Sequence, residues 1–255
     1  QNQISIAAWN INGLKSKINN PDFISLAEKH DVIFYFETFA DVGCENLVID
    51  GFTSTNIAQS GRHKNATRNG GGISVFIKNE LSAHIKPIKK TAEHFIWLKI
   101  NKSLTGLQQD IYCCGAYIQP KDSPIYDRLP DIDFFSALGH DINKYKNLGH
   151  IMFTGDLNAR IGQLSDCPPD PFSPVDEDPL SYVEIIDVPP RCSMDSVKNP
   201  WGTELINLCY IHDLCLLNGR ILGDLKGQPT FFGKKSNKQN GKNGTSVIDI
   251  TVTDK

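Results

Sequence analysis

The sequence lacks long apolar runs, Cys-x-x-Cys pairs and any excess of positive charge. No apolar run approaches the roughly 20 residues that span a bilayer, so we expect no membrane partner. The seven cysteines include no Cys-x-x-Cys pair, which argues against a zinc site or a disulfide framework and favours scattered buried thiols in a reducing compartment. A net charge of −3 argues against a simple nucleic-acid coat protein, so any nucleic-acid binding has to be local or metal-assisted.

Strand-like apolar runs recur along the 255 residues, and a few helical patterns lie between them. We expect strands at residues 4–9, 32–36, 72–77, 95–100, 111–118, 150–154, 214–217, 230–232 and 246–253. We expect helices at residues 21–29, 131–146 and 201–213. Because some adjacent strands have no helix between them, the pattern favours mixed sheets with helices outside over a purely parallel βαβ array.

Two polar stretches interrupt these runs. Residues 163–190 are rich in proline and acids and are expected to form a surface loop. Residues 201–253 hold too few elements for a core of their own, so we predict one domain over residues 1–255. The lysine-rich residues 233–244 join two strand-like runs and predict a long β-hairpin. A solvated hairpin tip and a finger that contacts a nucleic-acid backbone are both compatible with this composition.

The segment GDLNARIG, residues 155–162, places a carboxylate and a carboxamide directly after an apolar run. Side chains alternate across a strand, so Asp156 and Asn158 are expected to project from the same face. The carboxyl end of a buried strand is a favoured place for ligands in α/β sheets. Turn chemistry alone explains the same residues equally well, because Gly, Asp and Asn are common at turns.

Other polar residues also stand at the ends of expected strands or within them. Asn10 precedes a glycine turn, Glu37 follows five apolar residues, Tyr117 precedes Gln-Pro, and Asp249 lies inside an apolar run. Each alone has a structural explanation, such as a turn, a solvent-facing end or edge protection. A charged residue in an apolar strand is seldom fully buried without a partner or a metal. Their joint occurrence with GDLNARIG favours a shared polar site.

The ordered series WNINGL, FET, GGISVFIK, YIQP, GDLNARIG, LLNGR and SVIDITV resembles the endonuclease/exonuclease/phosphatase superfamily. It most closely resembles the AP-endonuclease-like endonuclease domains of LINE-type (non-LTR) retrotransposons, to which RCSMD and GTSVID also point. The resemblance implies a DNase I-like four-layer α/β sandwich, in which two mixed β-sheets pack face to face with helices outside. It also implies an Mg²⁺-dependent endonuclease, with Mn²⁺ as a substitute, that nicks double-stranded DNA and leaves a 3′-OH to prime target-primed reverse transcription.

The resemblance also implies roles for the strand-end residues. Glu37 matches the principal metal ligand and Asn10 assists it. Asp156 matches the residue that orients or deprotonates the attacking water, and Asn158 the one that contacts the scissile phosphate. These residue types suit the chemistry, because Mg²⁺ needs only one or two protein carboxylates and an amide can donate to a phosphate without adding charge.

Further positions match substrate-side and supporting roles. Tyr117 matches a phosphate-contacting tyrosine, and Asp249 a carboxylate near the metal site. Arg160 and Asn218 are implied DNA contacts. The expected hairpin adds the DNA-contacting lysines Lys234, Lys235, Lys238 and Lys242.

The implied partners are double-stranded DNA, a reverse transcriptase and other domains of the same polyprotein, with an intracellular location that is nuclear at the point of action. Family members carry an Asp-His pair on a last strand some tens of residues after the position of Asp249, whereas the sequence ends at Lys255. We therefore expect the domain to lack its last strand, beside that of Asp249, and to be nearly inactive as it stands. A catalytically incomplete nucleic-acid-binding domain and a phosphoesterase acting on a small or lipid substrate stay open as alternatives.

Overall fold

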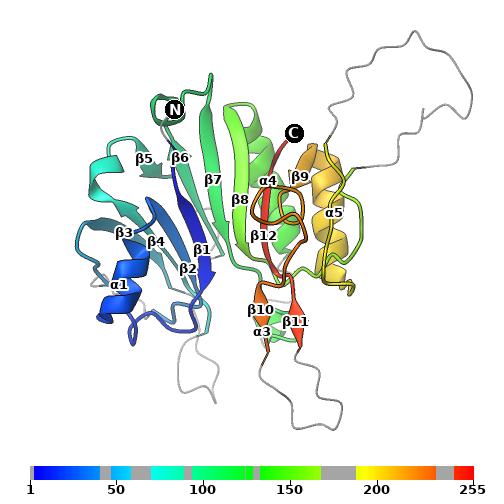
Figure 1. Cartoon of the computed structure of the whole chain (residues 1–255), viewed down its shortest axis with the longest axis horizontal. Coiled ribbons are helices and arrows are strands. Elements are labelled where there is room, and N and C mark those ends of the chain that lie inside the picture. Colours follow the sequence, from blue (N-terminus) through cyan, green and yellow to red (C-terminus); the bar gives the residue numbers. More distant parts are fainter. Residues whose placement is uncertain are drawn as a thin grey trace, which may run out of the picture.

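The computed structural model describes residues 3–40, 47–58, 70–88, 94–123, 125–128, 133–167, 188–233 and 244–255. These residues form two mixed β-sheets and a short two-stranded ribbon (Figure 1). The first sheet has the order β1 (Ile6–Asn10), β2 (Val32–Phe36), β4 (Ile73–Lys78) and β3 (Phe52–Ile57). The second has the order β5 (Ile85–Pro87), β6 (Phe95–Ile100), β7 (Asp110–Ala116), β8 (Gly149–Asp156), β12 (Asp249–Asp254) and β9 (Leu214–Leu216).

The two sheets pack face to face through alternating side chains. All five residues of β2 are buried: Val32, Phe34 and Phe36 face the second sheet, while Ile33 and Tyr35 face the outer layer. The strands β6 and β7 contribute to the same inter-sheet core from the opposite side. Burial on both faces explains why these strands are continuous apolar runs in the sequence.

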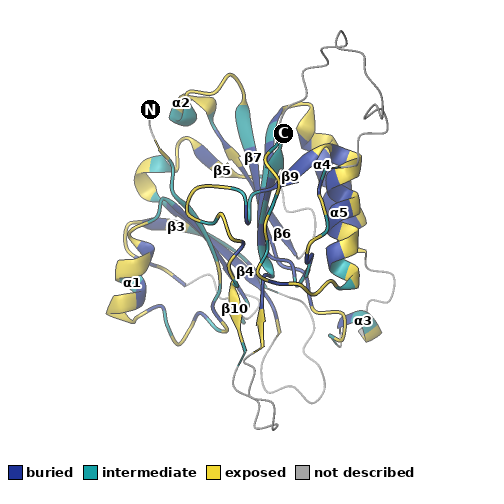
Figure 2. Ribbon diagram, turned by 45° about the vertical axis from the view of Figure 1, so that its right-hand side comes forward, coloured by how far each residue is buried: buried dark blue, intermediate teal, exposed yellow. Residues whose placement is uncertain are grey.

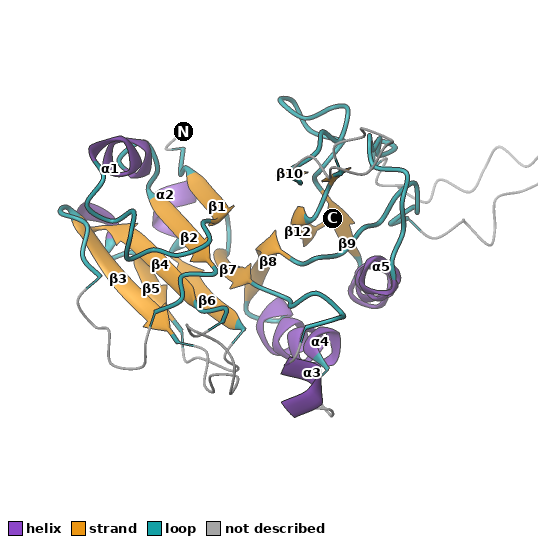
Figure 3. Cartoon of the chain, turned by 90° about the horizontal axis from the view of Figure 1, so that it is seen from below, coloured by secondary structure: helices purple, strands orange, loops and turns teal. Residues whose placement is uncertain are grey.

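Helices cover the outer faces of both sheets. Helix α1 (Pro21–Ala27) packs on the first sheet, and helices α4 (Phe134–Lys146) and α5 (Pro200–His212) pack on the second, as Figure 3 shows from below. Figure 2 shows that the buried residues concentrate in the strands and on the inner faces of α4 and α5. The predicted four-layer α/β sandwich with helices outside is confirmed. No helix in the described part of the chain is long and apolar enough to cross a membrane.

Several short elements escape sequence analysis. Strands β3 and β5 and the four-residue helices α2 (Lys102–Thr105) and α3 (Ile125–Arg128) were not expected, nor was the 3₁₀ turn Asn79–Leu81. Strand β3 is missed because only its two end residues are buried. The run 246–253 was expected as one strand, but it divides into β11 (Thr245–Ser246) and β12. Strand β11 pairs antiparallel with β10 (Phe231–Phe232), so the base of the predicted hairpin is confirmed.

Strand β12 has neighbours on both sides. It pairs antiparallel with β8 from Asp249 to Thr253 and with β9 from Val252 to Asp254. Residues 214–216 lie beside Val252–Asp254, and the expectation that the domain lacks a last strand stays a prediction. Of the cysteines that the structure describes, four are buried, and Cys113 and Cys114 face opposite sides of β7.

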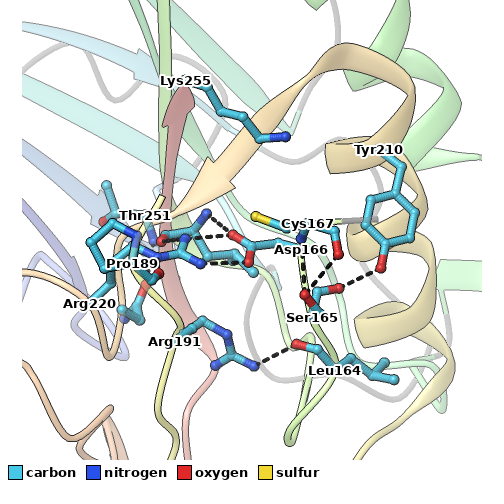
Figure 4. Close-up of polar contacts among 12 residues, drawn as sticks. Leu164, Ser165, Asp166, Cys167, Pro189, Arg191, Tyr210, Arg220, Thr251 and Lys255 are labelled. Carbon is cyan, nitrogen blue, oxygen red and sulfur yellow. Dashed lines mark hydrogen bonds and ion pairs between the residues drawn. The ribbon is translucent and has the colours of Figure 1, made fainter. Parts of the chain in front are cut away.

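A buried ion pair joins the two chain segments that flank residues 168–187. Arg220 donates to both carboxylate oxygens of Asp166 at 2.7 Å, and it also donates to the carbonyls of Pro189 and Leu216 (Figure 4). The side chains of Asp166 and Arg220 are only 1% and 6% exposed. Burial opposes ionisation of Asp166, but the hydrogen bonds from Arg220 and from the backbone of Leu216, together with the charge of Arg220, outweigh it and hold the pKa of that carboxyl below its usual value. Arg220 therefore connects Asp166 with Pro189, which lie on either side of residues 168–187.

Candidate active site

A cleft of about 980 Å³ opens where β1, β2 and β8 end and β12 begins. The residues expected from sequence that line it are Asn10, Glu37, Asp156, Asn158, Arg160 and Asp249. The structure therefore brings together side chains that are up to 239 residues apart in the chain, Asn10 and Asp249 being the extremes. Asn12, Lys121, Asp122, Asn199, Trp201, Thr230 and Phe231 also line the cleft.

Asp156 is the most buried carboxylate of the cleft. It is 3% exposed, accepts a hydrogen bond from Asn10 Nδ2 at 2.8 Å, and faces Asp249 across the β8–β12 ladder. Burial, followed by the charge of Asp249, raises the pKa of Asp156 to about 7, against the lowering effect of the Asn10 hydrogen bond. A carboxylate with a pKa near neutrality suits general-base work at physiological pH.

The segment after Asp156 presents alternate residues to the cleft. Asp156, Asn158 and Arg160 line it, while the residues between them, Leu157 and Ala159, are fully buried in the core. This alternation is the one that the sequence predicts for Asp156 and Asn158. Asn158 donates from its backbone to Asp156 Oδ1 at 3.2 Å and from Nδ2 to a carbonyl of the strand-end segment after β7 at 2.9 Å.

Glu37 is held in the cleft by Tyr117. The tyrosine hydroxyl donates to Glu37 Oε1 at 2.8 Å, and Tyr117 itself is 3% exposed and does not line the cleft. Burial and the charge of Glu37 raise the pKa of Tyr117, so the hydroxyl stays a donor. In this structure Tyr117 supports the carboxylate from behind, whereas the family resemblance implied a direct phosphate contact.

Three cleft residues have a left-handed backbone that side chains rarely adopt. The φ angles are 46° at Asn12, 50° at Glu37 and 48° at Asn158. Asparagine tolerates this region, but glutamate does so at a cost, typically of about 1–3 kcal/mol at such a position. Strained residues of this kind cluster at functional sites, where the surrounding structure holds them in place.

The expected DNA-contacting residues differ in where they lie. Arg160 lines the cleft, but its guanidinium forms a two-pronged ion pair with Asp195, at 2.8 and 2.6 Å. Asn218 lies outside the cleft lining, and both polar atoms of its amide bond the β12 backbone at Asp249 and Thr251. In this structure Asn218 thus joins β12 to the turn that follows β9. The four hairpin lysines, Lys234, Lys235, Lys238 and Lys242, lie outside the described residues.

The oxygen atoms of the cleft fit a hard divalent cation. Its lining contains carboxylates and carboxamides and no His or Cys, a donor set that suits Mg²⁺ or Mn²⁺ better than zinc. No cluster of three or more His, Cys, Asp or Glu with ligand spacing occurs in the part of the chain that the structure describes. Mg²⁺ usually keeps several waters and takes one or two protein carboxylates, so Glu37 with the amide oxygen of Asn10 would be sufficient.

Sequence reasoning missed three supporting residues of the cleft. Asp195 accepts hydrogen bonds from Arg160 and from the backbone of Val247. Thr230 accepts through Oγ1 from the backbone at Asp249 and its preceding residue, at the break between β11 and β12. Asn199 lies at the start of α5 beside the loop of Asn158. The segment RCSMD, which ends at Asp195, contributed to the family resemblance, but the sequence alone gave Asp195 no role.

Known structures share this fold. Comparison with protein-family models and with curated proteins finds no match to the sequence. The AP endonuclease LMAP of Leishmania major matches with a TM-score of 0.65 and 13% identity, over 98% of this chain and 79% of that one. The APE2 catalytic domain of Xenopus laevis matches with a TM-score of 0.65 and 15% identity, over 99% and 82%. The 3′ phosphatase NExo of Neisseria, solved with a product DNA hairpin, matches with a TM-score of 0.57 and 13% identity, over 99% and 87%.

At sequence identities of 13–15%, these matches establish a shared fold alone. The matches extend over 98% and 99% of this chain. The chain therefore has the DNase I-like α/β sandwich fold of these AP endonucleases.

Proposed function

We propose that the chain is a metal-dependent phosphodiesterase that nicks double-stranded DNA. The observation that carries this proposal is the excess of negative charge in the cleft. Its charged lining residues are Glu37, Asp122, Asp156, Asp249, Lys121 and Arg160. Since Arg160 is already paired with Asp195, the carboxylates repel a phosphodiester unless a divalent cation lies among them.

Each central residue has work that its position suits. A cation held by Glu37 and Asn10 would supply the positive centre that stabilises charge on the phosphoryl oxygens. Asp156, with its pKa near 7, accepts the proton of the attacking water. Asn158 has amide capacity left beyond its bond to the backbone, and it donates to a phosphate oxygen.

We further propose a role for the nick in priming reverse transcription. The neighbours are named as AP endonucleases and as a 3′ phosphatase seen with product DNA, which supports DNA as the substrate class. The ordered motifs of the sequence support an endonuclease of LINE type, whose nick leaves a 3′-OH that primes reverse transcription by another domain of the same polyprotein, in the nucleus. We keep a nucleic-acid-binding domain without catalysis as the second candidate.

The decisive experiment is plasmid nicking by a chain extended past Lys255, because the family resemblance implies an Asp-His pair there. The Glu37→Gln variant is its internal test. The variant keeps an acceptor for Tyr117 but removes the metal-binding charge, so nicking in Mg²⁺ is expected to fall at least about 10²-fold. EDTA is expected to abolish nicking by the wild-type chain, and Mn²⁺ to restore it. Glu80→Gln, an exposed change far from the cleft, is the matched control and is expected to have no effect.

The substrates in this experiment separate the candidate functions. Supercoiled plasmid reports nicking, an oligonucleotide with a 3′-phosphate reports end processing, and phosphoinositide vesicles report lipid phosphoesterase activity. Full activity of Glu37→Gln contradicts the metal site. DNA binding without turnover of any substrate supports the second candidate.

The lysine-rich residues 233–244 allow a separate prediction about DNA affinity. Replacing Lys234, Lys235, Lys238 and Lys242 by alanine is expected to weaken plasmid binding and to flatten its dependence on salt. Each phosphate that a lysine no longer neutralises reduces the slope of log K against log salt concentration by about 0.9. Titrations at several salt concentrations measure this slope, and an unchanged slope would mean that these lysines are merely solvated.

A further inference from the structure

Asn199 connects helix α5 to the loop that follows β8 and carries Asn158 and Arg160. Its Oδ1 accepts from the backbone of Arg160 at 3.0 Å and from Gly202, in the first helical turn, at 2.8 Å. Its Nδ2 donates to the carbonyl of Asn158 at 2.8 Å. Its backbone N–H donates to the carbonyl of Arg160 at 2.9 Å. The half-buried side chain of Asn199 thus bonds the backbone of Asn158 and Arg160 in the loop after β8, and the backbone of Gly202 at the start of α5.

The hydrogen-bond network fixes the orientation of this amide. Two backbone N–H groups face one side of it and a carbonyl faces the other. A flipped amide would place its NH₂ group against two donors and its oxygen against an acceptor. Every polar atom of the side chain is therefore engaged with backbone.

The first turn of α5 also touches the loop directly. A Cβ at Gly202 would lie 2.0 Å from the carbonyl oxygen of Arg160, so only glycine allows this approach. Below the loop, Leu157 and Ala159 are buried in the core. The loop is thus anchored from below by apolar side chains and from the side by Asn199.

We infer that Asn199 is a positioning residue for the reaction, beyond its role as a helix cap. By holding the carbonyl of Asn158 and the N–H of Arg160, it fixes the left-handed turn at Asn158, whose φ is 48°. That turn presents the Asn158 amide to the cleft beside Asp156. The inference rests on the proposed phosphodiesterase function for its kinetic consequence.

Asn20 provides a matched control for the capping role. It caps α1 with its side-chain oxygen, accepting from Asp22 N at 2.9 Å, and a proline follows it just as Pro200 follows Asn199. Asn20 lies outside the cleft lining. Asp and Ser are good caps at both positions, but ionised aspartate has no hydrogen to donate to the Asn158 carbonyl. Serine offers a single hydroxyl in place of the separate oxygen and NH₂ group with which the Asn199 amide accepts and donates.

The experiment compares Asn199→Ser and Asn199→Asp with Asn20→Ser and Asn20→Asp. Steady-state nicking of plasmid in Mg²⁺ is measured beside thermal unfolding. We expect both Asn199 variants to lower kcat about 10–100-fold, with KM and Tm close to wild type, because a small misplacement of a reacting group has effects of that size. Asn199→Asp adds a negative charge, whereas Asn199→Ser does not. A lower kcat in both variants therefore reports the loss of the Asn199 amide and not the added charge. The Asn20 variants should retain wild-type kcat.

A second measurement is independent of activity. Because the Asn199 amide bonds the loop, NMR resonances of the Arg160 backbone amide and the Asn158 side-chain amide should shift in the Asn199 variants and stay unchanged in the Asn20 variants. Wild-type kcat in both Asn199 variants, or unshifted resonances, overturns the inference. If the wild-type chain turns over no DNA, the proposed function falls, and the NMR comparison alone decides whether Asn199 holds the loop.

Discussion

Replacing Asp156 by asparagine is expected to lower DNA nicking about 10²–10⁴-fold, the range that a positioned general base contributes. The substitution keeps the size of the side chain and one of the two oxygens that accept hydrogen bonds from Asn10 and Asn158, so the cleft should keep its shape. It removes a carboxylate of the cleft lining whose pKa burial raises to about 7. Single-turnover nicking in saturating Mg²⁺ measures this loss without interference from product release.

The same substitution is expected to stabilise the fold at high pH. Since the folded state raises the pKa of Asp156, the folded chain binds its proton more tightly than the unfolded chain between about pH 4 and pH 7. Stability therefore falls as the pH rises through that window, by at most about 4 kcal/mol for a shift of this size. Asp156→Asn removes this cost, and we expect a gain of about 1–2 kcal/mol at pH 8 and none at pH 4.

Denaturant unfolding at the two pH values, without divalent cations, checks the gain in stability. Asp122→Asn is the matched control, because Asp122 lines the same cleft but is exposed. It should change nicking by no more than about threefold. Destabilisation of Asp156→Asn at pH 8, together with retained nicking, would show that Asp156 is a structural turn residue.

The sequence predicts the fold best where burial is two-sided. Strands β2 and β6, which contact cores on both faces, are continuous apolar runs and were found within a residue of their bounds. Strand β3 escapes because Phe52 and Ile57 are its only buried residues. The break between β11 and β12 escapes because it depends on a hydroxyl from Thr230, which no local pattern reveals.

The site shows the same division between local and distant causes. Glu37 and Asp156 were identifiable because a polar residue directly after a buried strand is conspicuous. The role of Asn199 was not, since an Asn-Pro pair before a helix already has a sufficient local explanation as a cap. Its bonds to Asn158 and Arg160 depend on where α5 docks, about 40 residues away in sequence. Tyr117 and Asn218 occupy supporting positions that a motif match does not distinguish from direct contacts.

Arg220→Met is expected to cost about 3–5 kcal/mol of folding stability, because it leaves the Asp166 carboxylate buried without its cation. Asp166 also accepts from the backbone of Leu216 at 2.7 Å, so the loss should loosen β9 as well as the segments at 164–167 and 188–191. A second change, Asp166→Asn, should recover much of the stability, since it removes the uncompensated charge and keeps the acceptor for Leu216.

Denaturant unfolding of the two single variants and the double variant measures the coupling between Arg220 and Asp166. Lys99→Ala is the control: it breaks an ion pair with Asp110 in which the lysine is 45% exposed, and it should cost less than about 1 kcal/mol. Because the folded state lowers the pKa of Asp166, the contribution of the pair is present above the unfolded-state pKa and is lost as the pH falls through the folded-state value. The difference between Arg220→Met and wild type should therefore shrink in acid. A pair that contributes little at neutral pH would mean that the segments flanking residues 168–187 are held by Arg191 and its bonds to Gly162 and Leu164.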